Sequence, residues 1–220
     1  MKLVVFDVDG TLVDSQQMIV DAMNAAMAAA DLPPLPRASI LSIVGLSLPV
    51  AVAALLPDVA PARHAQVVDG YRRSFQGLRQ QVEAPLYPGA QACLDALSQR
   101  DDLLLAIATG KSRRGLDAMI ETYGWHRRFV SLQTADHHPS KPHPAMLEAA
   151  LAEAGVAASR AVMVGDTEYD MQMASAAGLP DYGVAWGYHP AAQLGAAGAA
   201  LIAPDYPALT RLLQEWADEH

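Results

Sequence analysis

Short apolar runs recur along the chain, and most of them end at a glycine or a polar residue. Runs of this kind, rich in aliphatic and β-branched residues, are typical of strands that are buried on both faces. The predicted strands cover residues 2–8, 103–108, 129–132, 161–164, 182–186 and 200–203.

Helical patterns fill the gaps between the later strands. In residues 90–99, apolar residues recur at the spacing that places them on one helix face, and other patterns end at a glycine, as helices often do. The predicted helices cover residues 90–99, 112–123, 144–154, 168–177 and 207–217. This alternation predicts an α/β fold with a doubly wound, mostly parallel sheet, that is, a Rossmann-like core.

Residues 15–84 differ from the rest of the chain, because they carry helical patterns and no predicted strand. The patterns cover residues 18–30, 40–44, 50–55 and 62–81. We therefore expect an all-helical insertion directly after the first strand. The predicted domains are an α/β core of residues 1–14 and 85–220 and a helical domain of residues 15–84.

The composition excludes several classes of protein. Of the 220 residues, 52% are hydrophobic and 18% are charged, which is typical of a globular chain rather than a disordered one. The net charge of −9 opposes binding to nucleic acids and anionic membranes. The single cysteine, Cys93, allows no intrachain disulfide. Because neither a secretory signal nor a membrane-spanning apolar run is visible, we expect a cytoplasmic protein.

Acidic residues follow two of the predicted strands. Asp7 and Asp9 lie two residues apart, so the period of a strand places both side chains on one side. Asp166 follows another strand, and Asp170 lies one helical turn further on. Since close carboxylates repel each other, a bound Mg²⁺, which prefers oxygen ligands, would relieve the repulsion. The sequence thus predicts a magnesium site of Asp7, Asp9 and Asp166, with Asp170 as an outer ligand or as a residue that orients a water.

A second set of residues can bind an anion. Thr109 and Gly110 follow the second strand, and Lys141 lies in a loop before a helix. A hydroxyl, a backbone amide and an ammonium group together can hold a tetrahedral dianion such as phosphate. The pattern therefore favours phosphoryl transfer. Asp7 would attack phosphorus to give an aspartyl-phosphate, and Asp9 would protonate the leaving oxygen and later deprotonate the hydrolytic water. Lys141 would stabilise charge on the transferring group.

The same residues resemble the motifs of the haloacid dehalogenase-like hydrolases, and the resemblance covers the whole chain. Asp-Val-Asp-Gly-Thr-Leu-Val-Asp-Ser at residues 7–15 looks like the family's first motif in its phosphatase form. Thr109 stands at the second motif, and Lys141, within Ser-Lys-Pro, stands at the third. Asp166 and Asp170 stand at the fourth. The helical insertion resembles the cap domain that the family carries between its first two motifs.

The resemblance implies a role for each matching residue. Asp7 would be the nucleophile and a metal ligand, Asp9 the acid/base with its backbone carbonyl on the metal, and Asp166 the remaining protein ligand. The implied activity is a Mg²⁺-dependent phosphatase of a small phosphorylated metabolite, with phosphoglycolate as the first substrate to test. Arg72 and Arg73 of the cap are candidates to reach an anionic leaving group.

The sequence departs from the family's pattern at one position and leaves other functions open. Related proteins often have asparagine after the second-motif threonine, whereas this chain has Gly110. A phosphosugar mutase would need a cap that excludes water. A 2-haloacid dehalogenase would not need an acid at Asp9, because no leaving alcohol takes a proton. A non-catalytic module would bind a phosphorylated ligand without turning it over. We expect a monomer or a homodimer.

Overall fold

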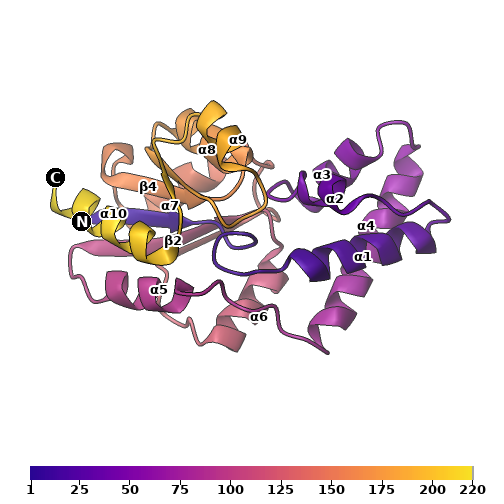
Figure 1. Ribbon diagram of the computed structural model, residues 1–220, viewed down its shortest axis with the longest axis horizontal. Helices are drawn as coiled ribbons and strands as arrows, with labels where there is room; N and C mark the ends of the chain where they lie inside the picture. The colour runs from indigo at the N-terminus through magenta and orange to yellow at the C-terminus, as the bar shows by residue number, and fades with distance from the viewer. Residues whose placement is uncertain (220) are drawn as a thin grey trace.

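A six-stranded sheet is the centre of the computed structural model, which describes residues 1–219 (Figure 1). All five strand pairings are parallel, and the strand order is β3-β2-β1-β4-β5-β6. The strands are β1 (Lys2–Phe6), β2 (Leu103–Thr109), β3 (Ser131–Thr134), β4 (Ala161–Gly165), β5 (Asp181–Val184) and β6 (Leu201–Ala203). The prediction of a doubly wound parallel sheet is confirmed.

Helices cover both faces of the sheet. One face carries α5 (Ala90–Ser98), α6 (Arg113–Tyr123) and α10 (Tyr206–Asp218), and the other carries α7 (Ala145–Ala154), α8 (Glu168–Ala177) and α9 (Ala191–Ala196). A 3₁₀ turn, Ala158–Arg160, precedes β4. In β1, Val4 and Phe6 pack against the first helix layer, whereas Leu3 and Val5 pack against the second. The strand is therefore apolar throughout because it is buried on both sides.

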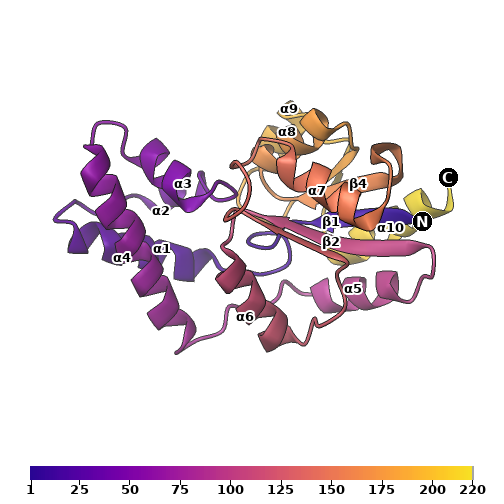
Figure 2. The same cartoon turned by 180° about the vertical axis from the view of Figure 1, so that it is seen from behind.

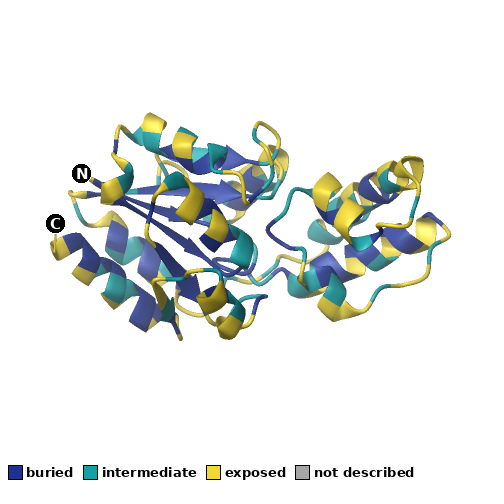
Figure 3. Cartoon of the chain, turned by 90° about the horizontal axis from the view of Figure 1, so that it is seen from above, coloured by how far each residue is buried: buried dark blue, intermediate teal, exposed yellow. Residues whose placement is uncertain are grey.

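The four helices within residues 16–79 form a separate unit beside the sheet (Figure 2). They are α1 (Gln16–Ala29), α2 (Arg37–Leu41), α3 (Leu48–Leu55) and α4 (Pro61–Arg79). This helical unit has a buried apolar cluster of its own (Figure 3). Gly70 lets α4 approach α1 closely, since a Cβ there would lie 3.2 Å from the Ala26 Cα. Within residues 1–219, no helix is both long and apolar enough to cross a membrane.

The two chain segments that join the helical unit to the sheet domain lie side by side. Val13 and Leu86 form an antiparallel bridge, and the Asp14 amide donates to the Pro85 carbonyl at 2.8 Å. The chain therefore leaves and re-enters the α/β domain at one place, as an insertion between β1 and α5 requires.

The structure differs from the sequence prediction mainly at the ends of elements. Strand β1 ends at Phe6 rather than at residue 8, because the chain turns and the Leu12 and Val13 amides donate to the Val8 carbonyl. Strand β3 begins two residues later than predicted, and β5 begins one residue earlier. Helix α9 was not predicted, since its alanine and glycine residues give only a short apolar pattern around the buried Leu194.

Candidate active site

The candidate residues gather at one edge of the sheet, at the carboxyl ends of the three central strands. Phe6 of β1 lies beside Ile107 of β2 on one side and Val164 of β4 on the other. The residues that follow these positions, Asp7 and Asp166 among them, are consequently neighbours although they are far apart in sequence. In open parallel sheets this edge is where ligands bind.

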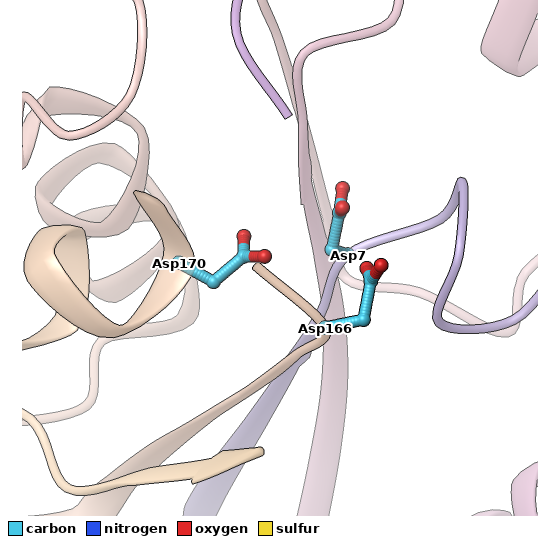
Figure 4. Close-up of side chains that lie close together, drawn as sticks. All are labelled: Asp7, Asp166 and Asp170. Atoms are coloured by element: carbon cyan, nitrogen blue, oxygen red, sulfur yellow. The ribbon is translucent and has the colours of Figure 1, made fainter. Parts of the chain in front are cut away.

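Three buried carboxyl groups gather around one small space (Figure 4). Asp7 follows β1, Asp166 follows β4, and Asp170 lies in the first turn of α8. One carboxylate oxygen from each residue lies within 4.8 Å of the other two. The buried Lys141 closes the group, with its Nζ 2.6 Å from Asp170 Oδ1 and 3.0 Å from Asp7 Oδ1.

Hydrogen bonds fix the side chain of Asp166. Its Oδ1 accepts from the Thr11 hydroxyl at 3.0 Å, and its Oδ2 accepts from the Tyr188 amide at 2.8 Å. Gly10 lies against the same carboxylate with φ +89°, and a Cβ at this position would overlap it. The turn after β1 and the loop after β5 therefore both hold Asp166 in place.

Asp170 joins the start of α8 to Lys141. Its Oδ2 accepts from the amide and the hydroxyl of Thr167, at 3.1 and 2.7 Å, which satisfies donors at the helix start as a capping box does. Its Oδ1 accepts from Lys141. Both oxygens are thus engaged by the protein, and Asp170 is held rigidly.

Burial dominates the electrostatics of this cluster. Desolvation raises the pKa of Asp7 to about 6; the Lys141 ammonium opposes this shift and the Asp170 charge adds to it. Desolvation and the charges of Asp170 and Asp7 raise the pKa of Asp166 well above its ordinary value. For Lys141, burial lowers the pKa, but the two adjacent carboxylates outweigh it and the net shift is upward. Lys141 therefore remains a cation.

The acidic cluster has the chemistry of a metal site. Asp7 Oδ1 is buried and accepts no aligned hydrogen bond from the described residues, although the Lys141 ammonium is near. Three carboxylates face a single ammonium group, so the cluster carries an excess of negative charge. A hard divalent cation takes oxygen ligands of this kind. Asp7 and Asp166, with Asp170 beside them, could therefore hold a metal ion.

Asp9 lies beside this cluster with partners of its own. Its Oδ1 accepts from the Ser15 hydroxyl at 2.6 Å, and its Oδ2 lies 2.8 Å from the Lys111 ammonium. The Lys111 ammonium also lies over the ring of Phe75 in α4, 4.9 Å from the ring centroid. The structure thus places Asp170, rather than the side chain of Asp9, together with Asp7 and Asp166.

A cavity of about 660 Å³ lies between the helical unit and the sheet domain. From the sheet domain it is lined by Asp7, Asp9, Thr109 and Gly110, among others. The Thr109 hydroxyl accepts from the Lys111 amide at 3.2 Å, which leaves its proton free to be donated. From the helical unit, apolar side chains and Arg72 line the cavity. Arg73 is not among the residues of the described chain that line it.

Sequence reasoning missed four residues that support the site: Thr11, Ser15, Lys111 and Tyr188. Thr11 and Ser15 lie within the motif at residues 7–15, so their hydroxyls were available as a signal. Lys111 directly follows Thr109 and Gly110, and its position next to a strand end marks it in the same way. Tyr188 holds Asp166 through its backbone amide, for which the sequence carries no signal, and its hydroxyl lies 2.9 Å from the Ser15 hydroxyl.

Comparison with known proteins identifies the family. The model of the haloacid dehalogenase-like hydrolase family matches residues 4–184. A Dickeya dadantii protein, "Probable phosphatase IndB", is 37% identical over 91% of this chain and 88% of its own length. The phosphoglycolate phosphatase of Rhodospirillum rubrum is 37% identical over 89% of this chain and 85% of its own length.

The fold agrees with these sequence matches. The crystal structure of a hydrolase from Pseudomonas syringae superposes with a TM-score of 0.87 at 24% identity, over 98% of this chain and 99% of that one. The chain therefore belongs to the haloacid dehalogenase-like hydrolases. Within this family it is an enzyme of the phosphatase type, that is, a phosphoric monoester hydrolase.

Proposed function

We propose that the chain is a Mg²⁺-dependent phosphatase that hydrolyses a small phosphomonoester through an aspartyl-phosphate. One observation carries this proposal. Asp7 combines a buried carboxylate oxygen without an aligned hydrogen bond, a cationic neighbour and a position on the cavity wall. A carboxylate that is desolvated yet held next to a fixed cation is suited to attack phosphorus.

Two aspartates divide the chemistry. An Asp7 oxygen attacks phosphorus, the bond from phosphorus to the leaving oxygen breaks, and Asp9 gives that oxygen its proton. The alcohol then leaves, and Asp9 takes a proton from a water that attacks the aspartyl-phosphate. The bond from phosphorus to Asp7 breaks, and inorganic phosphate is released. The contacts of Asp9 with Ser15 and Lys111 support this role, because they hold its carboxylate on the cavity wall beside Asp7.

Residues from two loops bind the phosphoryl group in this proposal. Thr109 donates its hydroxyl, and Gly110 offers its backbone amide. Lys141 supplies a positive charge 3.0 Å from Asp7 Oδ1. All three belong to the sheet domain, so phosphate binding does not depend on the position of the helical unit.

Asp7, Asp166 and the backbone carbonyl of Asp9 would hold the Mg²⁺ ion. Asp170 then acts as an outer residue, since Lys141 and Thr167 already occupy its two oxygens. When bound, the ion would supply positive charge that offsets the carboxylates and stabilises the transferring phosphoryl group.

The helical unit is proposed to be the cap domain, residues 15–84, on an α/β core of residues 1–14 and 85–220. The side-by-side crossings at Val13–Leu86 and Asp14–Pro85 support a hinge there. The cap supplies the apolar and cationic wall of the cavity, including Arg72 and Arg79. Phosphoglycolate, which carries a carboxylate on its leaving group, is accordingly the first substrate to test.

Phosphate release measured with and without Mg²⁺ tests the proposal on a panel of phosphorylated metabolites. We expect Mg²⁺-dependent turnover by the wild-type protein and none by Asp7→Asn. With an aryl phosphate as substrate, whose leaving group needs no proton, Asp9→Asn should still form the phosphorylated enzyme but hydrolyse it slowly. Mass spectrometry should then detect a covalent adduct with the mass of a phosphoryl group on the protein. Asp58→Asn, an exposed change of the same kind, is the matched control. Full activity of Asp7→Asn, or chloride release from a 2-chloro acid without any phosphatase activity, would contradict the proposal.

A further inference from the structure

Gly110 of the sheet domain lies directly against the backbone of the cap. A Cβ at this position would lie 2.5 Å from the Gly45 carbonyl oxygen and 2.8 Å from the Leu46 carbonyl oxygen. Both atoms belong to backbone, so neither can rotate away as the end of a side chain could. The φ angle of Gly110 lies outside the left-handed region, and its backbone conformation suits other residues as well. Glycine is therefore required here because a side chain would not fit against the cap, and not because of the backbone conformation.

Other contacts hold the same cap segment, residues 42–47, on the sheet domain. The Ser47 amide donates to the Ser140 hydroxyl at 2.8 Å. The Tyr169 hydroxyl donates to the Ser42 carbonyl at 3.1 Å. Gly45 has φ +102°, and a Cβ there would lie 2.9 Å from the Thr167 hydroxyl oxygen. The segment is thus seated closely on the loops that carry the proposed catalytic residues.

The seated segment forms one wall of the cavity. Val44, Leu46 and Leu48 face it from the cap, and Thr109 and Gly110 face it from the sheet domain. The distance between residues 42–47 and Gly110 therefore determines how much space a leaving group has beside the phosphoryl site.

We propose that Gly110 is a specificity-determining residue: its lack of a side chain lets the cap segment close onto the phosphate end of the cavity. This inference rests on the proposed phosphatase function. A side chain at residue 110 holds residues 42–47 away from the sheet domain and loosens the wall around the leaving group. The phosphate-binding groups stay in place, because they belong to the sheet domain and Gly110 contributes only its backbone amide, which a substitution keeps.

Kinetics of Gly110→Ala and Gly110→Asn test this proposal. We expect kcat/KM for a phosphomonoester to fall about tenfold to a hundredfold, since small misplacements of a substrate are costly. The inhibition constant of inorganic phosphate, which contacts only the sheet domain, should stay within about twofold of the wild-type value. Gly77→Ala is the matched control, because a Cβ at this position in α4 meets nothing within 4 Å. Its kinetics should equal those of the wild type.

Amide hydrogen exchange gives a reading that does not depend on activity. The Ser47 amide, which donates to Ser140, should exchange faster in Gly110→Ala than in Gly77→Ala. If the wild type hydrolyses no phosphomonoester, the proposed function fails, yet the exchange of Ser47 still decides whether Gly110 seats the cap.

Several outcomes would overturn the proposal. One is a kcat/KM of Gly110→Ala within twofold of the wild type, and another is an unchanged exchange rate at Ser47. A third is an inhibition constant for phosphate that rises by the same factor as kcat/KM falls, because the new side chain would then act by displacing the Gly110 amide from phosphate rather than by moving the cap segment. If Gly110→Ala does not fold, Ser140→Ala replaces it, since it removes an anchor of the same segment. There too, kcat/KM should fall while the phosphate inhibition constant stays near the wild-type value, and the absence of this difference would refute the idea.

Discussion

Lys111 and Asp9 form an ion pair with a separation of 2.8 Å, and both side chains are largely shielded from solvent. The stem of Lys111 runs over Gly115 of α6, where a Cβ would lie 2.9 Å from the lysine Cγ. On its other side the ammonium lies over the Phe75 ring of the cap. One side chain therefore connects the cap to the proposed acid/base residue.

Lys111→Met should lower kcat about tenfold to a hundredfold, because the Asp9 carboxylate loses the cation that orients it. Its hydrogen bond from Ser15 remains, so some activity should survive. Steady-state kinetics with Mg²⁺ measure the effect. Arg160→Met, which removes an exposed cation before β4, is the control and should leave kcat unchanged. Equal rates for Lys111→Met and the wild type would rule out this positioning role.

Asp7→Asn should not destabilise the metal-free protein, although it removes activity. The substitution keeps the size of the side chain and removes one of three crowded, buried carboxylates. In the presence of a chelator, urea unfolding should therefore give a free energy of unfolding equal to or above that of the wild type. A marked loss of stability would mean that the Lys141 contact outweighs the repulsion from Asp166 and Asp170.

The metal-free protein should lose stability as the pH rises from about 4 to above 6. The pKa of Asp7 is raised to about 6 and that of Asp166 is raised well above its ordinary value, in both cases chiefly by burial. In this range the folded protein keeps protons that the unfolded chain has released, so its free energy of unfolding falls with rising pH. Thermal unfolding in a chelator at several pH values measures this dependence.

Added Mg²⁺ should reduce or reverse this dependence, since a metal ion binds the deprotonated carboxylates. Asp7→Asn should flatten the profile, because one of the titrating groups is gone. A wild-type profile that is flat in the chelator, or that responds to Mg²⁺ no more than Asp7→Asn does, would contradict this account of the cluster.

The sheet and the positions of the acidic residues at its edge could be predicted from the sequence, because each strand and the polar residue after it form a short, continuous pattern along the chain. Apolar strands such as β4 are unambiguous when both faces are buried, and polar residues such as Thr109 and Asp166 mark their carboxyl ends. The turn after Phe6 was not predicted, because the backbone bonds to the Val8 carbonyl leave no side-chain signature.

The contacts between cap and sheet domain could not be predicted either. The departure at Gly110 was visible in the sequence, but its meaning depends on Gly45 and Leu46, which lie more than sixty residues earlier in the chain. The Asp9 side chain shows the same limit. Its spacing from Asp7 predicted a shared site, whereas the end of β1 at Phe6 lets the two carboxylates take different partners.

Lys141→Met should destabilise the protein by about 3–5 kcal/mol, because it leaves buried charges without their cation. Asp170→Asn should cost less, since an asparagine oxygen can still accept from Thr167. In the double variant Lys141→Met/Asp170→Asn, the loss should be smaller than the sum of the two single losses, as expected for residues in direct contact. Urea unfolding in a chelator measures all four proteins of this cycle. Additive losses would mean that the two residues act independently, in conflict with the 2.6 Å contact between Lys141 Nζ and Asp170 Oδ1.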